Sequence, residues 1–126
     1  MTQLTLLLKG EDLLRVADAM GLSVRDAGLL LSAAIRPAMR LYGNDLYPDV
    51  VTKAAAVMHS IVAHRPLVDG NKRLGWIALV TTLAINDVVL DVPDDEGFDL
   101  TMRVAEGSAD VDAITAQVHV WIAQQH

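Results

Sequence analysis

The sequence predicts a single all-α domain, a compact bundle of about six helices around a central apolar helix. Hydrophobic residues make up 52% of the 126 residues but aromatic residues only 4%, so the core must consist mainly of Leu, Val, Ile and Ala. Leu and Ala favour helices, and apolar positions recur at helical spacing in successive segments separated by turn residues. The chain shows no repeat, low-complexity tract or linker, which indicates one domain over residues 1–126.

The first third of the chain is expected to form two helices. Residues 10–20 are amphipathic and are followed by Gly21, a typical C-terminal cap. Residues 23–26 have the form of a capping box, with Asp where Glu is more usual. A second helix should therefore run from there towards Met39, with Pro37 kinking or ending it.

The middle of the chain is expected to contain a third helix and then the central one. A turn-rich break over residues 42–48 comes first, and Pro48 suits the first position of the next helix, with Asp49 in its first turn. Apolar residues at helical spacing continue from there to Val62. The segment 71–85 is apolar nearly all round, which is typical of a helix at the centre of a bundle.

The last third of the chain is expected to contain two more helices. Residues 88–93 are extended and β-branched, and they are interpreted as a connector or at most one leg of a small hairpin. Acidic residues then open a helix that ends near Gly107. A final helix is predicted over residues 108–125.

Charge and hydropathy limit the possible partners. The net charge is −6 at pH 7, and an acidic surface argues against general nucleic-acid binding, so no direct nucleic-acid partner is expected. The apolar stretch over residues 74–85 is too short to span a bilayer, and the first residues lack the basic start of a signal peptide. The chain has no cysteine and therefore no disulfide or thiolate site. We expect a cytoplasmic protein with no membrane partner.

The most informative segment reads His64-Arg65-Pro66-Leu67-Val68-Asp69-Gly70-Asn71-Lys72-Arg73. It precedes the long apolar helix, and the unpaired N–H groups at a helix N-terminus bind anions. Lys72 and Arg73 in the first turn oppose the helix dipole unless an anion lies there. Gly70 lets a ligand approach the backbone, and Asp69 suits a Mg²⁺ ion that bridges phosphate oxygens. The set fits a metal-bound nucleotide polyphosphate.

A simpler interpretation of the same segment is a turn followed by a helix cap. Asp-Gly is a common turn pair, Asp and Asn both cap helices, and exposed Lys and Arg side chains are usually solvated. Residue types alone favour this interpretation. The order and density of the residues favour a nucleotide site only in combination with a family resemblance.

That resemblance is to the signature of the Fic/Doc superfamily, His-x-Phe-x-(Asp/Glu)-Gly-Asn-(Lys/Gly)-Arg. Residues 69–73 match it outright, and Leu67 replaces the Phe. Lys72 is typical of the Doc branch, the death-on-curing toxins, whereas AMP-transferring Fic enzymes have Gly there. The similarity covers roughly residues 40–86, including a Leu-Tyr-Pro segment at 43–48 and the helix before the signature at 53–60.

The resemblance implies a toxin of a toxin–antitoxin pair that is a protein Ser/Thr kinase. Such a kinase transfers the γ-phosphate of ATP to a threonine of elongation factor Tu and so blocks translation, and an antitoxin of the Phd type restrains it. By position, Asp69 would take part in catalysis and hold Mg²⁺. The phosphate pocket would be lined by Gly70, Asn71, Lys72 and Arg73. The flap that positions the target would comprise Gly43, Leu46, Tyr47 and Pro48.

Arg65 occupies the position of the family's catalytic His, and His64 lies one residue too early. Arginine stays protonated and has no acceptor lone pair, so it cannot serve as a general base, although it can bind phosphate. Our leading hypothesis is an inactivating replacement of a native His, because a growth-stopping toxin is hard to produce intact. The alternatives are a naturally inactive binding protein and a local shift that lets His64 act. In a helix such a shift turns a side chain by about 100°.

Two other functions stay open. AMP transfer to a protein hydroxyl would follow the Fic pattern, but Lys72 argues against it. A non-catalytic partner of an antitoxin, an operator complex or the translation machinery is favoured by Arg65. His59, the acidic residues 94–96, and Trp76 and Trp121 are assigned structural roles.

Overall fold

The computed structural model describes residues 4–125 and confirms the predicted all-α bundle of six helices. The elements are α1 (Gly10–Ala19), α2 (Ala27–Ile35), the 3₁₀ helix η1 (Arg36–Ala38), β1 (Arg40–Leu41), β2 (Asn44–Asp45), α3 (Val50–His64), α4 (Asn71–Ala84), α5 (Asp94–Ala105) and α6 (Val111–Gln125). Within this part of the chain no helix combines the length and the apolar character needed to cross a membrane.

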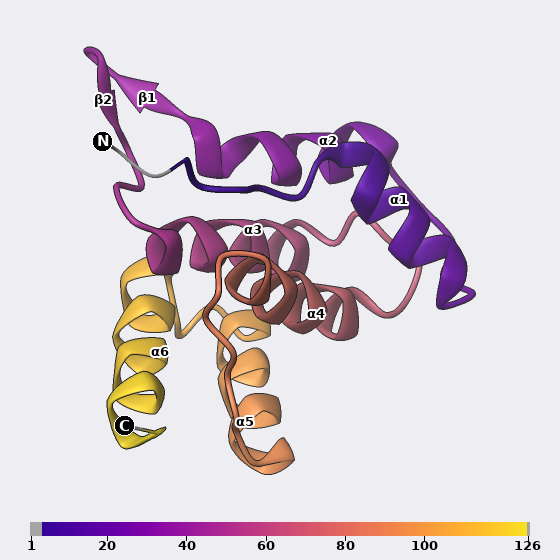
Figure 1. Cartoon of the computed structure of the whole chain (residues 1–126). Coiled ribbons are helices and arrows are strands. Elements are labelled where there is room, and N and C mark those ends of the chain that lie inside the picture. Colours follow the sequence, from indigo (N-terminus) through magenta and orange to yellow (C-terminus); the bar gives the residue numbers. More distant parts are fainter. Residues whose placement is uncertain (1–3, 126) are drawn as a thin grey trace.

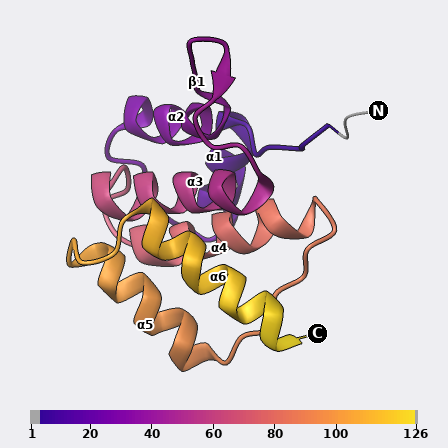
Figure 2. The same ribbon diagram turned by 90° about the vertical axis from the view of Figure 1, so that its left-hand side faces the viewer.

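Helices α3 and α4 form the middle layer of the molecule, with α1 and α2 on one side and α5 and α6 on the other (Figures 1 and 2). Two clusters of buried side chains fill the spaces between these layers, and the middle layer contributes to both. Met58, Leu79 and Leu83 face α5 and α6, whereas Ile61 and Leu74 face α1 and α2. The two central helices thereby connect one continuous core.

The most buried element is α3, not the helix predicted over residues 71–85. Ten of the 15 residues of α3 are buried, against six of 14 in α4. The reason is that both outer layers cover α3, whereas α4 leaves Ile77 and Val80 partly exposed. Both helices are apolar, so composition alone could not rank them.

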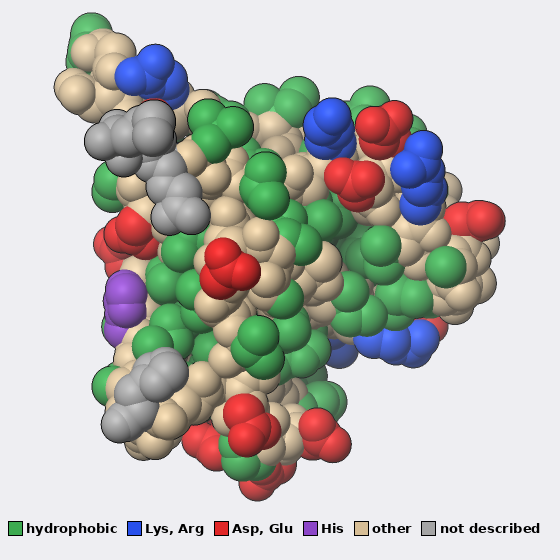
Figure 3. All heavy atoms as spheres, in the orientation of Figure 1, with side chains coloured by type: hydrophobic (Ala, Val, Ile, Leu, Met, Phe, Trp, Pro, Cys, Tyr) green, Lys and Arg blue, Asp and Glu red, His purple; other side chains and the backbone are tan. Residues whose placement is uncertain are grey.

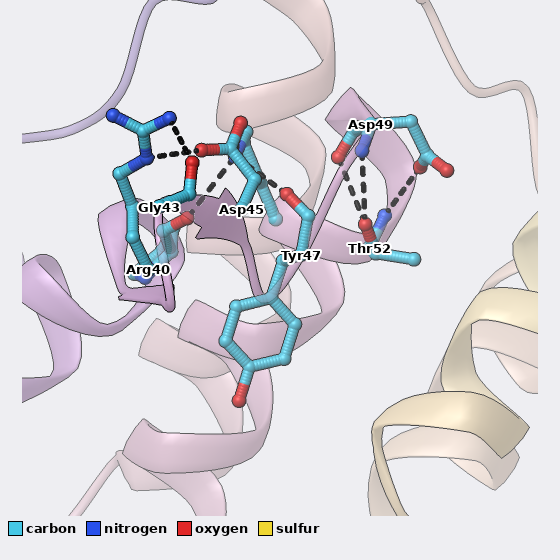
Figure 4. A network of polar contacts seen from close by, with 8 residues as sticks. Arg40, Gly43, Asp45, Tyr47, Asp49 and Thr52 are labelled. Atoms are coloured by element: carbon cyan, nitrogen blue, oxygen red, sulfur yellow. Dashed lines mark hydrogen bonds and ion pairs between the residues drawn. The ribbon is translucent and has the colours of Figure 1, made fainter.

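Two helix starts differ from the prediction, and an Asp side chain sets each of them. Asp26 caps α2 by accepting a hydrogen bond from the N–H of Leu29 at 3.0 Å, so no capping box forms over residues 23–26. Asp49 caps α3 by accepting from the N–H of Thr52 at 2.9 Å, which leaves Pro48 outside the helix (Figure 4). Each carboxylate satisfies an N–H group that has no partner within its helix.

The sheet is a small hairpin at residues 40–45, where the sequence predicted only a turn-rich break. Tyr42 and Gly43 at its tip have φ of 51° and 79°, as in the type I′ turns that join two-residue hairpins. The hairpin projects from one end of the molecule (Figure 1). Residues 88–93 form a connector without strand pairing. Of the two predicted forms, a connector or one leg of a hairpin, the connector is confirmed.

Buried Lys53 on α3 anchors the base of the hairpin. Its ammonium group donates to the backbone oxygens of Tyr47 and Pro37, the latter at 3.3 Å, and lies 3.5 Å from a carboxylate oxygen of Asp45. Asp45 also pairs with Arg40 across the two strands at 3.2 Å (Figure 4). The hairpin is thus attached to α3, although two strands alone are only marginally stable in water.

Candidate functional site

The motif segment forms a tight loop between α3 and α4, and Gly70 is the residue that lets it close. Gly70 has φ of 88°, a left-handed conformation that favours glycine. A Cβ atom at this position would lie 2.8 Å from a methyl carbon of Leu22, so a side chain here would require Leu22 to move. Gly70 therefore lets the loop pack closely against Leu22, and the approach of a ligand to its backbone stays a prediction.

The side chain of Asn71 holds the loop in shape. Its Oδ1 accepts a hydrogen bond from the N–H of Leu67 at 2.8 Å, and its Nδ2 donates to the carbonyl oxygen of Leu67 at 3.1 Å. Leu67, in place of the family's Phe, is buried in the core between the outer and central helices. Asn71 borders the predicted pocket, but its amide group is already used by the protein backbone.

Asp69 is the residue best placed to hold a cation. Its Oδ1 accepts a hydrogen bond from the N–H of Gly70 at 2.8 Å, and its side chain is exposed on the pocket. The structure shows no bond to its second carboxylate oxygen within residues 4–125. The same residues contain no group of three or more acidic or His side chains that could enclose a metal. A cation at Asp69 would thus need ligand oxygens, as Mg²⁺ on a phosphate chain has.

A cavity of about 800 Å³ opens between the motif loop and α5. Four cationic side chains border it, against two carboxylates, and in a chain of net charge −6 this is a local reversal of sign. The cations are Arg25, Arg65, Lys72 and Arg73, and the carboxylates are Asp69 and Asp94. In Figure 3 Lys and Arg side chains are visible at the hairpin, over α1 and α2 with acidic ones between them, and at the lower edge near α4, while other acidic side chains lie over the start of α5.

The rest of the cavity wall is mostly apolar and includes Trp76. The other apolar wall residues include Val62, Val92, Phe98 and Ala105. The Trp76 ring stands edge-on to Trp121, with centroids 5.9 Å apart. A Cβ atom on Gly97 would lie 2.9 Å from the Trp76 ring, so glycine is what lets α5 come this close. The cavity wall therefore combines cationic and aromatic side chains.

Arg65 and His64 differ sharply in position. Arg65 follows the last residue of α3 in a left-handed conformation, φ 53° and ψ 61°, and borders the cavity. His64 is exposed, does not border the cavity, and has its ring 6.4 Å from that of His59. The hypothesis that His64 replaces the missing base is therefore not supported.

The segment over residues 22–26 lies directly against the motif loop, which the sequence did not reveal. Val24 forms an isolated antiparallel bridge with Leu67, and the N–H of Val68 donates to the carbonyl oxygen of Ser23 at 2.9 Å. These pairings join residues about 40 positions apart. The local pattern, which resembled a capping box, carried no signal for such a contact.

The segment over residues 43–48, predicted to be the target-positioning flap, lies at the other end of α3. It precedes the first residue of α3, whereas the motif loop follows the last. At 1.5 Å per residue the 15-residue helix separates them by roughly 20 Å. Gly43, Leu46, Tyr47 and Pro48 do not border the cavity. The structure brings together the predicted residues 65 and 69–73, but not this segment.

A polar cluster beneath the hairpin joins Arg36 of η1 to His59 and Ser60 of α3. The Arg36 guanidinium contacts Nδ1 of His59 at 2.9 Å and donates to Tyr47 Oη at 2.8 Å and Ser60 Oγ at 3.0 Å. Burial, followed by the charges of Arg36 and His64, lowers the pKa of His59, and Asp110 opposes this shift. His59 is half-buried and belongs to this cluster rather than to the cavity, which agrees with the structural role that the sequence predicted.

Comparison with known sequences agrees with this geometry. The sequence model described as the Fic/DOC family matches residues 5–83, more than half of the chain. The chain therefore belongs to the Fic/Doc family, whose members are enzymes that transfer phosphate or nucleotide groups to proteins. It is also similar to the curated protein "Toxin Doc" of Mycolicibacterium smegmatis, with 46% identity over 99 residues that cover 77% of this chain and 76% of the relative.

Proposed function

We propose that this chain is the toxin of a toxin–antitoxin pair, built as a protein Ser/Thr kinase that uses ATP and Mg²⁺. The observation that carries the proposal is the cavity beside α4, whose wall combines four cationic side chains with the aromatic rings of Trp76 and Phe98. A nucleotide combines an anionic triphosphate with a flat purine, so a wall of this composition suits it. The similarity to a protein named Toxin Doc supports the biological role.

In this proposal each motif residue has a separate task. The unpaired N–H groups at the start of α4 would bind the phosphate chain, since a helix N-terminus favours an anion. Lys72 and Arg73 would contact phosphate oxygens, and the free carboxylate oxygen of Asp69 would hold Mg²⁺. When bound, Mg²⁺ would offset the negative charge that develops between the phosphates during transfer.

The proposed reaction has one proton that needs an acceptor. A target hydroxyl oxygen bonds to the γ-phosphorus while the bond from that phosphorus to the bridging oxygen of ADP breaks. The hydroxyl proton must pass to a base. In the family motif that base is a His, and in this chain Arg65 occupies its position on the cavity. Since a guanidinium accepts no proton, we infer that phosphate transfer by this chain is strongly impaired while nucleotide binding is kept.

Lys72 favours γ-phosphate transfer over AMP transfer. AMP-transferring relatives have Gly at this position, and a cation there would attract the terminal phosphates to the motif end of the cavity. Lys72 is exposed on the cavity wall, so its ammonium group is available to a ligand. AMP transfer is therefore the less favoured reaction.

The experiment is transfer of labelled phosphate to elongation factor Tu by this chain and by its R65H variant. With γ-labelled ATP, we expect the variant to label a threonine of the target and the parent to be far weaker, because only the variant has a base. Label transferred from α-labelled ATP instead would show AMP transfer. Absence of transfer by both proteins, together with measurable ATP binding, would contradict the kinase proposal.

A second candidate function is a naturally inactive member of the family that binds ATP or an antitoxin without turnover. Arg65 favours it, because the side chain adds a fourth cation to the cavity while removing the base. An antitoxin of the Phd type is the proposed partner in both cases. A target in translation also implies a cytoplasmic location, which we propose for the chain on that ground.

A further inference from the structure

We propose that Arg25, in the loop before α2, is a positioning residue that sets the direction of the side chain at position 65. The inference rests on the proposed function, in which position 65 is where the general base belongs. Arg25 lies 40 residues away in the sequence and outside the family motif. Its contacts are nevertheless with the backbone at the start of the motif loop.

The Arg25 guanidinium closes the C-terminal end of α3. Its Nε donates to the carbonyl oxygen of Arg65 at 2.9 Å, and its Nη2 donates to the same oxygen at 2.5 Å and to that of His64 at 3.2 Å. The last carbonyl groups of a helix have no partner within it, and the helix dipole makes them negative. A planar cation with several donors suits them well.

Arg65 needs this support because its backbone conformation is unfavourable. Its φ of 53° and ψ of 61° lie in the left-handed region, which side-chain-bearing residues rarely adopt. In that conformation the chain leaves the helix, and the side chain of residue 65 borders the cavity, whereas that of His64 does not. The contacts to both carbonyl groups hold the backbone on either side of this bend.

The main chain around Arg25 is itself paired with the motif loop. The N–H groups of Arg25 and Asp26 both donate to the carbonyl oxygen of Pro66, at 2.8 Å and 2.9 Å, and Val24 forms the bridge with Leu67. Within residues 4–125 Arg25 makes no ion pair with a carboxylate, so no acidic side chain competes for its guanidinium. The residue is therefore fixed at both its main chain and its side chain.

The alternative is that Arg25 binds phosphate directly, since it borders the cavity and its Nη1 has no hydrogen bond within the described residues. The two roles differ in which kinetic constant they change. A positioning residue acts on the base and so on kcat. A phosphate contact acts on the bound nucleotide and so on the KM for ATP.

The kinetic test uses R65H as the active background and adds R25M, R25K or the control R15M. Arg15 on α1 is an exposed cation that does not border the cavity. For R65H/R25M we expect kcat for phosphate transfer to fall by about tenfold to a hundredfold with the KM for ATP nearly unchanged, as for other small misplacements of a reacting group. R25K should recover part of kcat, because an ammonium group can hold a single carbonyl, and R15M should change neither constant.

A raised KM for ATP with unchanged kcat would overturn the proposal in favour of a phosphate contact, and no change in either constant would overturn it outright.

A second measurement does not depend on catalysis. The carbon-13 chemical shifts of residue 65 in the parent and in R25M report whether the backbone keeps its left-handed conformation. We expect R25M to lose it, and retention would contradict the proposal. If R65H transfers no phosphate, the proposed kinase function fails, and the chemical shifts still decide the role of Arg25.

Discussion

At the scale of single residues, the chemistry of one side chain decides what each position can do. Arg65 stands at the end of α3 where the family motif has His, and of these two side chains only His can accept a proton at neutral pH. Asn71 and Asp69 match the family motif, but both also make hydrogen bonds to the backbone of the loop. The identity of a motif residue therefore does not state how many of its polar atoms are left for a ligand.

His59 gives a prediction on pH dependence. Arg36 has no acceptor atom, so Nδ1 of His59 must accept the hydrogen bond, which requires the neutral ring. The lowered pKa of His59 means that, below its ordinary value of 6.5, the unfolded chain takes up a proton that the folded chain does not. This part of the free energy of unfolding is fully present above that pH and is lost as the pH falls towards the lowered pKa.

The measurement is the urea midpoint of the parent and of H59Q at about pH 7.5 and about pH 5.5. We expect the midpoint of the parent to fall on acidification and that of H59Q to fall less, since Gln does not titrate. H119Q, a change at an exposed position on α6, is the control and should behave as the parent does. Equal falls in the parent and H59Q would exclude His59 as the source.

At the scale of the elements, close approach of α3 and α4 depends on Gly75. A Cβ atom there would lie 2.4 Å from a methyl carbon of Val62 and 3.4 Å from the carbonyl oxygen of Met58. This contact explains why glycine occupies the interior of a helix, where it costs about 1 kcal/mol relative to alanine. The two central helices, which carry the start and the end of the motif loop, are set at this distance by one missing side chain.

We predict that G75A destabilises the protein by about 1–3 kcal/mol, the usual cost of overpacking a core. The gain in helix propensity is smaller than this cost, because the Cβ atom cannot be accommodated unless buried Val62 or the helix that carries it shifts. The matched control is G28A on α2, where glycine is exposed and the added carbon meets only a side-chain oxygen of Asp26 at 3.2 Å. Chemical denaturation of both variants would show the contrast, and a G75A protein as stable as G28A would refute it.

At the scale of the whole molecule, the cavity lies where three parts of the chain meet. Arg25 comes from the loop before α2, the motif residues from the loop between α3 and α4, and Phe98 from α5. A ligand in this cavity would contact all three parts and would bind the folded chain only. Folding stability and nucleotide binding should therefore be linked.

This linkage predicts a thermal shift. With Mg²⁺ and ATP at a hundred times Kd the free energy of unfolding should rise by about 2.7 kcal/mol, which corresponds to roughly 10 °C in Tm for a domain of this size. The double variant K72M/R73M should lose most of the shift, because it removes two of the four cations of the cavity. R15M should keep it. An unchanged Tm of the parent with ATP would contradict the nucleotide proposal, whatever the outcome of the kinase assay.

The sequence by itself determined the all-α class, the order of the six helices and the motif at the start of α4. These features depend on local patterns, namely helical spacing of apolar residues, capping residues and the contiguous residues 69–73, and such patterns are visible along the chain. It also placed Arg65 at the position of the family's catalytic His, because the spacing of the motif assigns each position by counting back from residues 69–73.

Only the tertiary structure decided which helix is central, which segment lies beside the motif and what Arg25 contacts. α3 is central because two layers cover it, and Val24 meets Leu67 across about 40 residues of sequence. The segment over residues 43–48 carries a recognisable local pattern, yet the length of α3 separates it from the cavity. Contacts between distant segments follow from how the helices pack against each other, and a pattern read along the chain contains no record of that packing.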